Sequence, residues 1–171
     1  MFEKIFSAEL KCNFVCKIIA AFLFILQLNF ICDAASPKIL VICPSASENT
    51  RIIEKQIKTK LGINNVQNES NSIKDYKVIV IGTQVIQKKA DPSVISYLSQ
   101  NSFSGKKVFL FSTYETDLGS AIEDMKSACS GASFGVPLKI KFKHSGNKKK
   151  KINFPYKKLI KWIRKIEKTA K

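Results

Sequence analysis

Residues 38–62 read KILVICPSASENTRIIEKQIKTKLG, and this stretch decides the fold class. It begins with a short apolar run rich in β-branched residues, which ends at Pro44. It continues into a segment where isoleucine and leucine recur at helical spacing before Gly62. The pattern predicts a buried strand, a loop and a helix.

The same unit repeats along the chain. Two further apolar runs, KVIVIG at 77–82 and KKVFLFST at 106–113, predict strong strands, and weaker strands are expected at 63–66 and 136–142. A second helix should begin at Asp91-Pro92, because Asp is a good cap and Pro suits the first helical position. The last two helices are expected at 117–130 and 155–169.

Strands without polar alternation are buried on both faces, and their exchange with helices favours a parallel sheet between two helical layers. We expect an α/β fold: a three-layer α/β/α arrangement with a five-stranded parallel sheet of order 2-1-3-4-5, the weaker strands lying at the edges. A ligand would then sit beyond the carboxyl ends of the central strands, which lead into residues 44–50, 83–90 and 112–116.

The first 35 residues are expected to lie outside this fold. Residues 18–32, IIAAFLFILQLNFIC, form an uncharged run after a segment with three lysines and before Ala34 and Ala35. This layout is typical of a secretory signal peptide, cleaved after one of those alanines, which would leave a domain at 36–171 in a secreted or extracytoplasmic protein. The alternative is an uncleaved anchor that holds the domain at a membrane.

Cysteine and histidine usage argues against several site classes. The sequence has five Cys and one His, with no C-x-x-C pair, so a zinc site or a metal-centred hydrolase is hard to assemble. His144 lies in a lysine-rich loop, where a solvated residue is the better interpretation than a catalyst. Cys43 and Cys129 would remain after cleavage, either paired or separately buried, with burial favoured.

The loop between the first strand and helix carries several hydroxyls. Ser45, Ser47 and Thr50, with the amide of Asn49, stand where a helix begins and where its first N–H groups lack partners. Such a loop can hold a phosphate without any lysine. The alternative is that Ser47 or Asn49 simply caps the helix.

The chain from about residue 37 to 169 resembles a short-chain flavodoxin. Ser45-Ala-Ser-Glu-Asn-Thr50 is similar to that family's phosphate loop, Asp75-Tyr-Lys-Val-Ile-Val-Ile-Gly-Thr83 to its third strand, and Ser104-Gly-Lys-Lys-Val-Phe-Leu-Phe-Ser-Thr113 to the motif before its third flavin loop. The resemblance implies binding of flavin mononucleotide (FMN) by an electron carrier rather than an enzyme. The residues it implies around the cofactor are Ser45, Ser47, Glu48, Asn49 and Thr50 at the phosphate, Thr83 and Gln84 on one side of the ring, and Thr113, Tyr114 and Glu115 on the other.

The sequence also departs from that pattern. Glu48 stands where the family has Gly, which places a carboxylate beside the expected phosphate. The segment 83–90 has no aromatic residue and no Gly, so Tyr114 is the residue expected to stack on the ring. These departures keep open a second interpretation, a flavodoxin-like domain without cofactor that serves as a basic interaction module.

The charge is strongly localised. Lys and Arg number 29 against 13 Asp and Glu, which gives a net charge of +16. Residues 138–171 hold fourteen basic residues and one acid, for +13, while residues 36–137 hold twelve and nine, for +3. A field of this size attracts an acidic redox partner or an anionic membrane or glycan surface. Nucleic acid is disfavoured, because few aromatics are interleaved with the basic residues, and we expect a monomer.

Overall fold

The computed structural model describes residues 38–45, 47–63, 73–142 and 156–171. These residues belong to one compact unit, Pro37–Lys171. The expected leader, the expected strand beyond Ile63 and the loop with His144 lie outside the described residues. Within the described ranges, none of the helices combines the length and the apolar character that crossing a membrane requires.

Three strands form the main part of the sheet: β1 (Ile39–Ile42), β2 (Val78–Ile86) and β4 (Lys107–Tyr114). They are parallel, with β2 between the other two, so that Val80 pairs with Val41 on one side and with Phe109 on the other. Two short strands, β5 (Ser133–Phe134) and β6 (Leu138–Lys141), pair in parallel with the beginning and the end of β4. The described order β1-β2-β4-β5/β6 corresponds to the 1-3-4-5 part of the predicted order.

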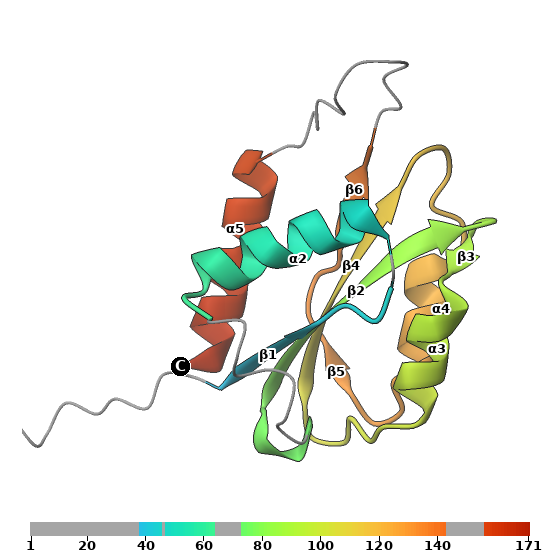
Figure 1. The fold of residues 1–171 in the computed structure, drawn as a ribbon. Coiled ribbons are helices and arrows are strands. Elements are labelled where there is room, and N and C mark those ends of the chain that lie inside the picture. Colours follow the sequence, from blue (N-terminus) through green and yellow to red (C-terminus); the bar gives the residue numbers. More distant parts are fainter. Residues whose placement is uncertain (1–37, 46, 64–72, 143–155) are drawn as a thin grey trace, which may run out of the picture. The chain divides into compact units, whose positions relative to one another are not determined.

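Two helices cover each face of this sheet (Figure 1). Helices α2 (Glu48–Lys60) and α5 (Tyr156–Ala170) lie on one side, and α3 (Pro92–Ser99) and α4 (Ala121–Ala128) lie on the other. A 3-10 turn, η2 (Ile73–Asp75), precedes β2. The predicted three-layer α/β/α class is therefore confirmed.

Successive side chains of the central strands enter two separate cores. Val78 and Val80 pack with α2 and α5, whereas Ile79 and Ile81 pack with α3 and α4. Both faces of the strand are thus buried, which explains why its sequence shows no polar alternation.

The prediction of five strands, all parallel, was wrong in one respect. Strand β2 continues to Ile86, and the chain turns back at once into β3 (Lys89–Ala90), which pairs with it in antiparallel fashion. The two turn residues, Gln87 and Lys88, have φ of 49° and 66°. Such turns favour Asn-Gly, so the sequence gives little sign of a hairpin in what was expected to be a loop.

The last predicted strand is shorter than expected, and β5 before it was not predicted. The segment expected as one strand at 136–142 forms β6 only from Leu138, and Val136 is 59% exposed. Pro137 explains the gap between β5 and β6, because proline has no N–H to donate to a neighbouring strand.

Helix α5 buries its tryptophan. Trp162 is 4% exposed, whereas Tyr156 at the start of the helix is 49% exposed. The Trp162 indole N–H donates to the Val136 carbonyl at 2.6 Å, and its ring packs edge-on against Phe109. This hydrogen bond satisfies the indole and lets a large side chain enter the core.

Candidate functional site

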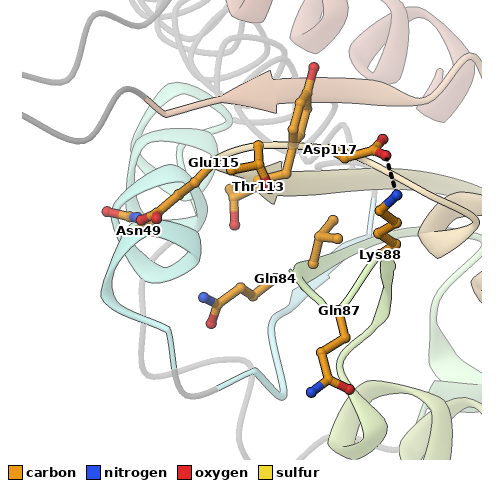
Figure 2. A pocket seen from close by; sticks show the side chains of 10 residues that line it. Asn49, Gln84, Gln87, Lys88, Thr113, Glu115 and Asp117 are labelled. Atoms are coloured by element: carbon orange, nitrogen blue, oxygen red, sulfur yellow. Dashed lines mark ion pairs between the residues drawn. The ribbon is translucent and has the colours of Figure 1, made fainter.

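A cavity of about 340 Å³ lies at the carboxyl ends of β2 and β4 (Figure 2). Three segments form its wall: the start of α2, the β2–β3 hairpin and the loop that follows β4. The lining residues are Asn49, Gln84, Val85, Gln87, Lys88, Thr113, Tyr114, Glu115, Thr116 and Asp117. The position is the one expected for a ligand site in an open parallel sheet, and the volume falls in the range of about 300–1,000 Å³ of small-molecule pockets.

Half of the residues predicted for the site line this cavity. They are Asn49, Gln84, Thr113, Tyr114 and Glu115. The other five, Ser45, Ser47, Glu48, Thr50 and Thr83, are not among the described residues of its wall.

Two of these five lie directly behind the wall. Thr50 and Thr83 are fully buried. The hydroxyls of Thr50 and Thr113 lie 2.7 Å apart, and the Thr113 hydroxyl is 3.4 Å from the Thr83 carbonyl oxygen. These residues therefore support the cavity wall through Thr113.

Ser45 is engaged on the side of α3. Its buried hydroxyl donates to Asp91 Oδ2 at 2.8 Å. Asp91 is also the N-cap of α3, where its other carboxylate oxygen accepts the Ser93 N–H at 2.9 Å. Burial alone would raise the pKa of Asp91, but the hydrogen bonds from Ser93 and Ser45 outweigh it and leave this pKa below its ordinary value. Asp91 is thus a stable carboxylate beneath the loop.

The start of α2 presents a mixed surface. Ser47 is the N-cap, but its side chain makes no capping hydrogen bond. Glu48 and Arg51 are both exposed. Asn49 is 9% exposed, and its Oδ1 atom is buried without a hydrogen-bond partner. A buried acceptor without a partner is uncommon, and this one belongs to a residue of the cavity wall.

Five of the lining residues were not among the predicted site residues: Val85, Gln87, Lys88, Thr116 and Asp117. Lys88 and Asp117 form an exposed ion pair at 3.2 Å across the mouth of the cavity (Figure 2). The Gly119 N–H and the Lys88 ammonium hold the pKa of Asp117 below its usual value. Asp117 was expected inside a helix, but α4 begins only at Ala121, so this carboxylate belongs to the loop.

The β2–β3 hairpin is attached to the loop before α4. The Lys88 carbonyl accepts the Ser120 N–H at 2.8 Å, and the Ala90 N–H donates to Asp124 Oδ2 at 3.2 Å. Gly119 allows this approach, because a Cβ atom there would lie 1.9 Å from the Lys88 carbonyl oxygen. Tertiary contacts therefore stabilise a turn that its own residues do not favour.

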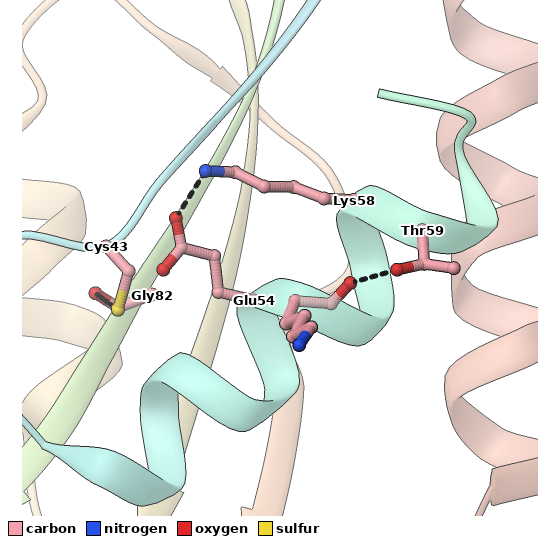
Figure 3. A network of polar contacts seen from close by, with 6 residues as sticks. Cys43, Glu54, Lys58, Thr59 and Gly82 are labelled. Carbon is pink, nitrogen blue, oxygen red and sulfur yellow. Dashed lines mark hydrogen bonds and ion pairs between the residues drawn. The ribbon is translucent and has the colours of Figure 1, made fainter. Parts of the chain in front are cut away.

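The two described cysteines are not among the residues that line the cavity. Cys43 and Cys129 are free thiols, and burial raises the pKa of each to about 12. The Cys43 Sγ atom lies 3.7 Å from the Gly82 carbonyl oxygen, and Glu54 nearby forms an ion pair with Lys58 at 2.8 Å (Figure 3). No cluster of three or more metal-binding side chains occurs in the described part of the chain.

The solved structures that this chain resembles include several flavodoxins. Flavodoxin 2 from Bacillus cereus matches with a TM-score of 0.55 at 19% identity over 77% of this chain and 99% of that one. A flavodoxin from the domain Archaea matches with a TM-score of 0.55 at 18% identity over 77% and 97%. Fusobacterium nucleatum flavodoxin bound to flavin mononucleotide matches with a TM-score of 0.53 at 18% identity over 78% and 98%.

The sequence itself matches no protein-family model and no curated protein. The match extends over nearly the whole length of each of these neighbours. The chain has a flavodoxin-like fold.

Proposed function

We propose that this protein binds FMN noncovalently in the cavity between α2, the β2–β3 hairpin and the loop after β4, and that it carries electrons. The observation that carries the proposal is the cavity itself, which lies where parallel α/β sheets bind ligands. Its volume and mixed polar wall suit a flat heterocycle. The flavodoxin neighbours, one of which is described as bound to FMN, support the same ligand.

The residues of the wall offer interactions that a flavin ring can use. Asn49 and Gln84 contribute amide groups, and the unpaired Oδ1 atom of Asn49 could accept a hydrogen bond from a ring N–H. Tyr114 is half-buried and supplies the aromatic face. The hairpin and the loop at 113–117 would enclose the ring from two sides.

When bound, the flavin supplies the redox chemistry, and the protein's part is to orient it and tune its electrostatics. The wall carries one cation, Lys88, and two carboxylates, Glu115 and Asp117, a formal charge of 1 − 2 = −1. A negative surrounding disfavours added negative charge, so the wall would oppose the reduced, anionic form of the ring. No side chain of the wall needs to act as an acid or base.

The partner and the location belong to the same proposal. The exposed residues of α5 include Lys157, Lys158, Lys161, Arg164, Lys165 and Lys168. This face complements an acidic redox partner or an anionic membrane or glycan surface. Residues 18–32 support an exported protein, secreted after cleavage or held at a membrane if the segment is retained.

A second candidate is a cofactor-free domain that acts as a basic interaction module. It is favoured by the hydrogen bonds that occupy the Ser45 and Thr50 hydroxyls, and by Glu48 at the start of α2. The two candidates differ in whether the cavity binds flavin at all.

A fluorescence titration distinguishes them. The purified full chain is added to FMN, and saturable quenching that persists at moderate salt supports the electron carrier. Gel filtration should then yield a yellow protein. Absence of quenching at all protein concentrations would leave only the interaction module.

A further inference from the structure

The loop between β1 and α2 is closed by its own hydrogen bonds. Ser45 is fully buried, and its hydroxyl donates to Asp91 Oδ2 at 2.8 Å. The same hydroxyl oxygen accepts the Ser47 N–H at 3.5 Å. A hydroxyl carries one proton, so the donor of Ser45 is already used.

The Thr50 hydroxyl is committed in the same way. It is buried and lies 2.7 Å from the Thr113 hydroxyl, which in turn lies 3.4 Å from the Thr83 carbonyl oxygen. Both protons are used when Thr113 donates to that carbonyl and Thr50 donates to Thr113. The hydroxyls of Ser45 in the loop and of Thr50 in the first turn of α2 are therefore unavailable to an anion.

The charges around the loop are also unfavourable for a phosphate. Asp91 lies under the loop as a carboxylate, held in that state by Ser45 and Ser93. Glu48 occupies the first turn of α2, where a phosphate would approach the helix N-terminus. Arg51, which is exposed, is the first cation along the helix.

We propose that the cavity recognises a flavin by its ring and makes little use of the phosphate, so that riboflavin and FMN bind with similar affinity. This inference rests on the proposed flavin binding. Two residues would keep FMN from binding more tightly than riboflavin: Ser45, through its hydrogen bond to Asp91, and Glu48. Ring recognition uses Gln84 and Tyr114, which line the cavity at the ends of β2 and β4.

The test is a pair of fluorescence titrations of the full chain, one with FMN and one with riboflavin. Both are run in about 0.15 M salt, where the Debye length of about 8 Å screens the basic surface. Charge-assisted hydrogen bonds to a phosphate would favour FMN by about a hundredfold or more. We expect the two dissociation constants to agree within about tenfold. A preference for FMN of a hundredfold overturns the inference alone, and absence of binding by either flavin overturns the proposed function as well.

Charge-neutralising variants test whether Glu48 and Asp91 weaken FMN binding. Glu48→Gln and Asp91→Asn should each strengthen FMN binding about two- to tenfold, and leave riboflavin binding unchanged. Asn is as good an N-cap as Asp, so Asp91→Asn should retain α3, and exposed Glu48 provides a second variant if it does not. Glu123→Gln, on the exposed face of α4, is the matched control and should change neither affinity. Equal shifts for both flavins, or no shift for FMN, would contradict the assignment.

Discussion

The hydroxyls of Thr50 and Thr113 lie 2.7 Å apart, and both residues are buried. This bond joins the first turn of α2 to the end of β4, two segments separated by 63 residues. It therefore fixes one side of the cavity to the central sheet. Because neither hydroxyl reaches solvent, Thr50 depends on Thr113 for its hydrogen bond, whereas Thr113 has the Thr83 carbonyl as a second partner.

A double-mutant cycle measures this dependence. Thr113→Val keeps the side-chain shape but leaves the Thr50 hydroxyl buried without its partner, which should lower the free energy of unfolding by about 1–3 kcal/mol. The double variant Thr50→Val/Thr113→Val removes both groups and should be more stable than the sum of the single changes predicts. Urea denaturation provides all four free energies, and additive effects would argue against a direct bond.

The Ser45–Asp91 contact predicts how stability depends on pH. The pKa of Asp91 is lowered in the folded protein, so its contribution is present above the unfolded pKa of about 3.9 and is lost as pH falls through the folded value. Asp91→Asn should therefore be less stable than the native protein near neutrality, and the difference should vanish in acid.

Asp91→Ala is the comparison for this experiment. It also removes the N-cap of α3, which costs about 1 kcal/mol at every pH. Urea denaturation from neutral to acid pH measures the free energy of unfolding of the native protein and of both variants. A stability difference between Asp91→Asn and the native protein that does not change with pH would show that the carboxylate charge contributes nothing to stability.

Gly82 illustrates how closely the sheet and its core are packed. A Cβ atom at this position would lie 2.1 Å from the Cζ atom of Phe111, which is fully buried. Gly82→Ala should therefore destabilise the protein by about 1–3 kcal/mol or more through overpacking. Adding Phe111→Leu should recover part of that loss, although it is destabilising by itself. Thermal denaturation of the three variants tests this, and a stable Gly82→Ala protein would contradict the packing.

The basic face of α5 should bind anionic surfaces in a salt-sensitive manner. Replacing Lys161, Arg164 and Lys168 by Glu should abolish most binding to phosphatidylglycerol vesicles, because each exposed cation contributes about 1 kcal/mol near such a surface. The matched control places Glu at Lys55, Lys77 and Lys89, which are exposed on other segments. Vesicle sedimentation over a salt series gives the comparison. Equal loss in both variants would indicate a response to net charge rather than to this face.

The fold could be predicted from the sequence because the central strands β2 and β4 are buried on both faces. Runs such as KVIVIG do not alternate polar and apolar residues, and they recur at intervals that leave room for helices. These two features predict a parallel sheet between helical layers. The β2–β3 hairpin could not be predicted, because Gln87 and Lys88 are not typical turn residues. Their conformation depends on contacts with Gly119 and Ser120.

The candidate site was predicted only in part, for a related reason. Its position follows from the carboxyl ends of the strands, and Asn49, Gln84 and the residues at 113–115 lie there. The use of each hydroxyl depends on partners distant in sequence: Ser45 bonds to a residue 46 positions away. No local pattern distinguishes a serine that faces a ligand from one that faces a buried carboxylate.

The location of bound FMN tests flavin binding in the cavity most directly, because a chain of net charge +16 could also attract an anionic ligand without a specific site. A nuclear magnetic resonance titration of the labelled chain with FMN locates the binding. We expect saturable chemical-shift changes at the cavity residues, centred on Asn49, Gln84 and 113–117, with little change along α5. Shifts confined to the lysines of α5, or no saturable shift at all, would contradict flavin binding in the cavity.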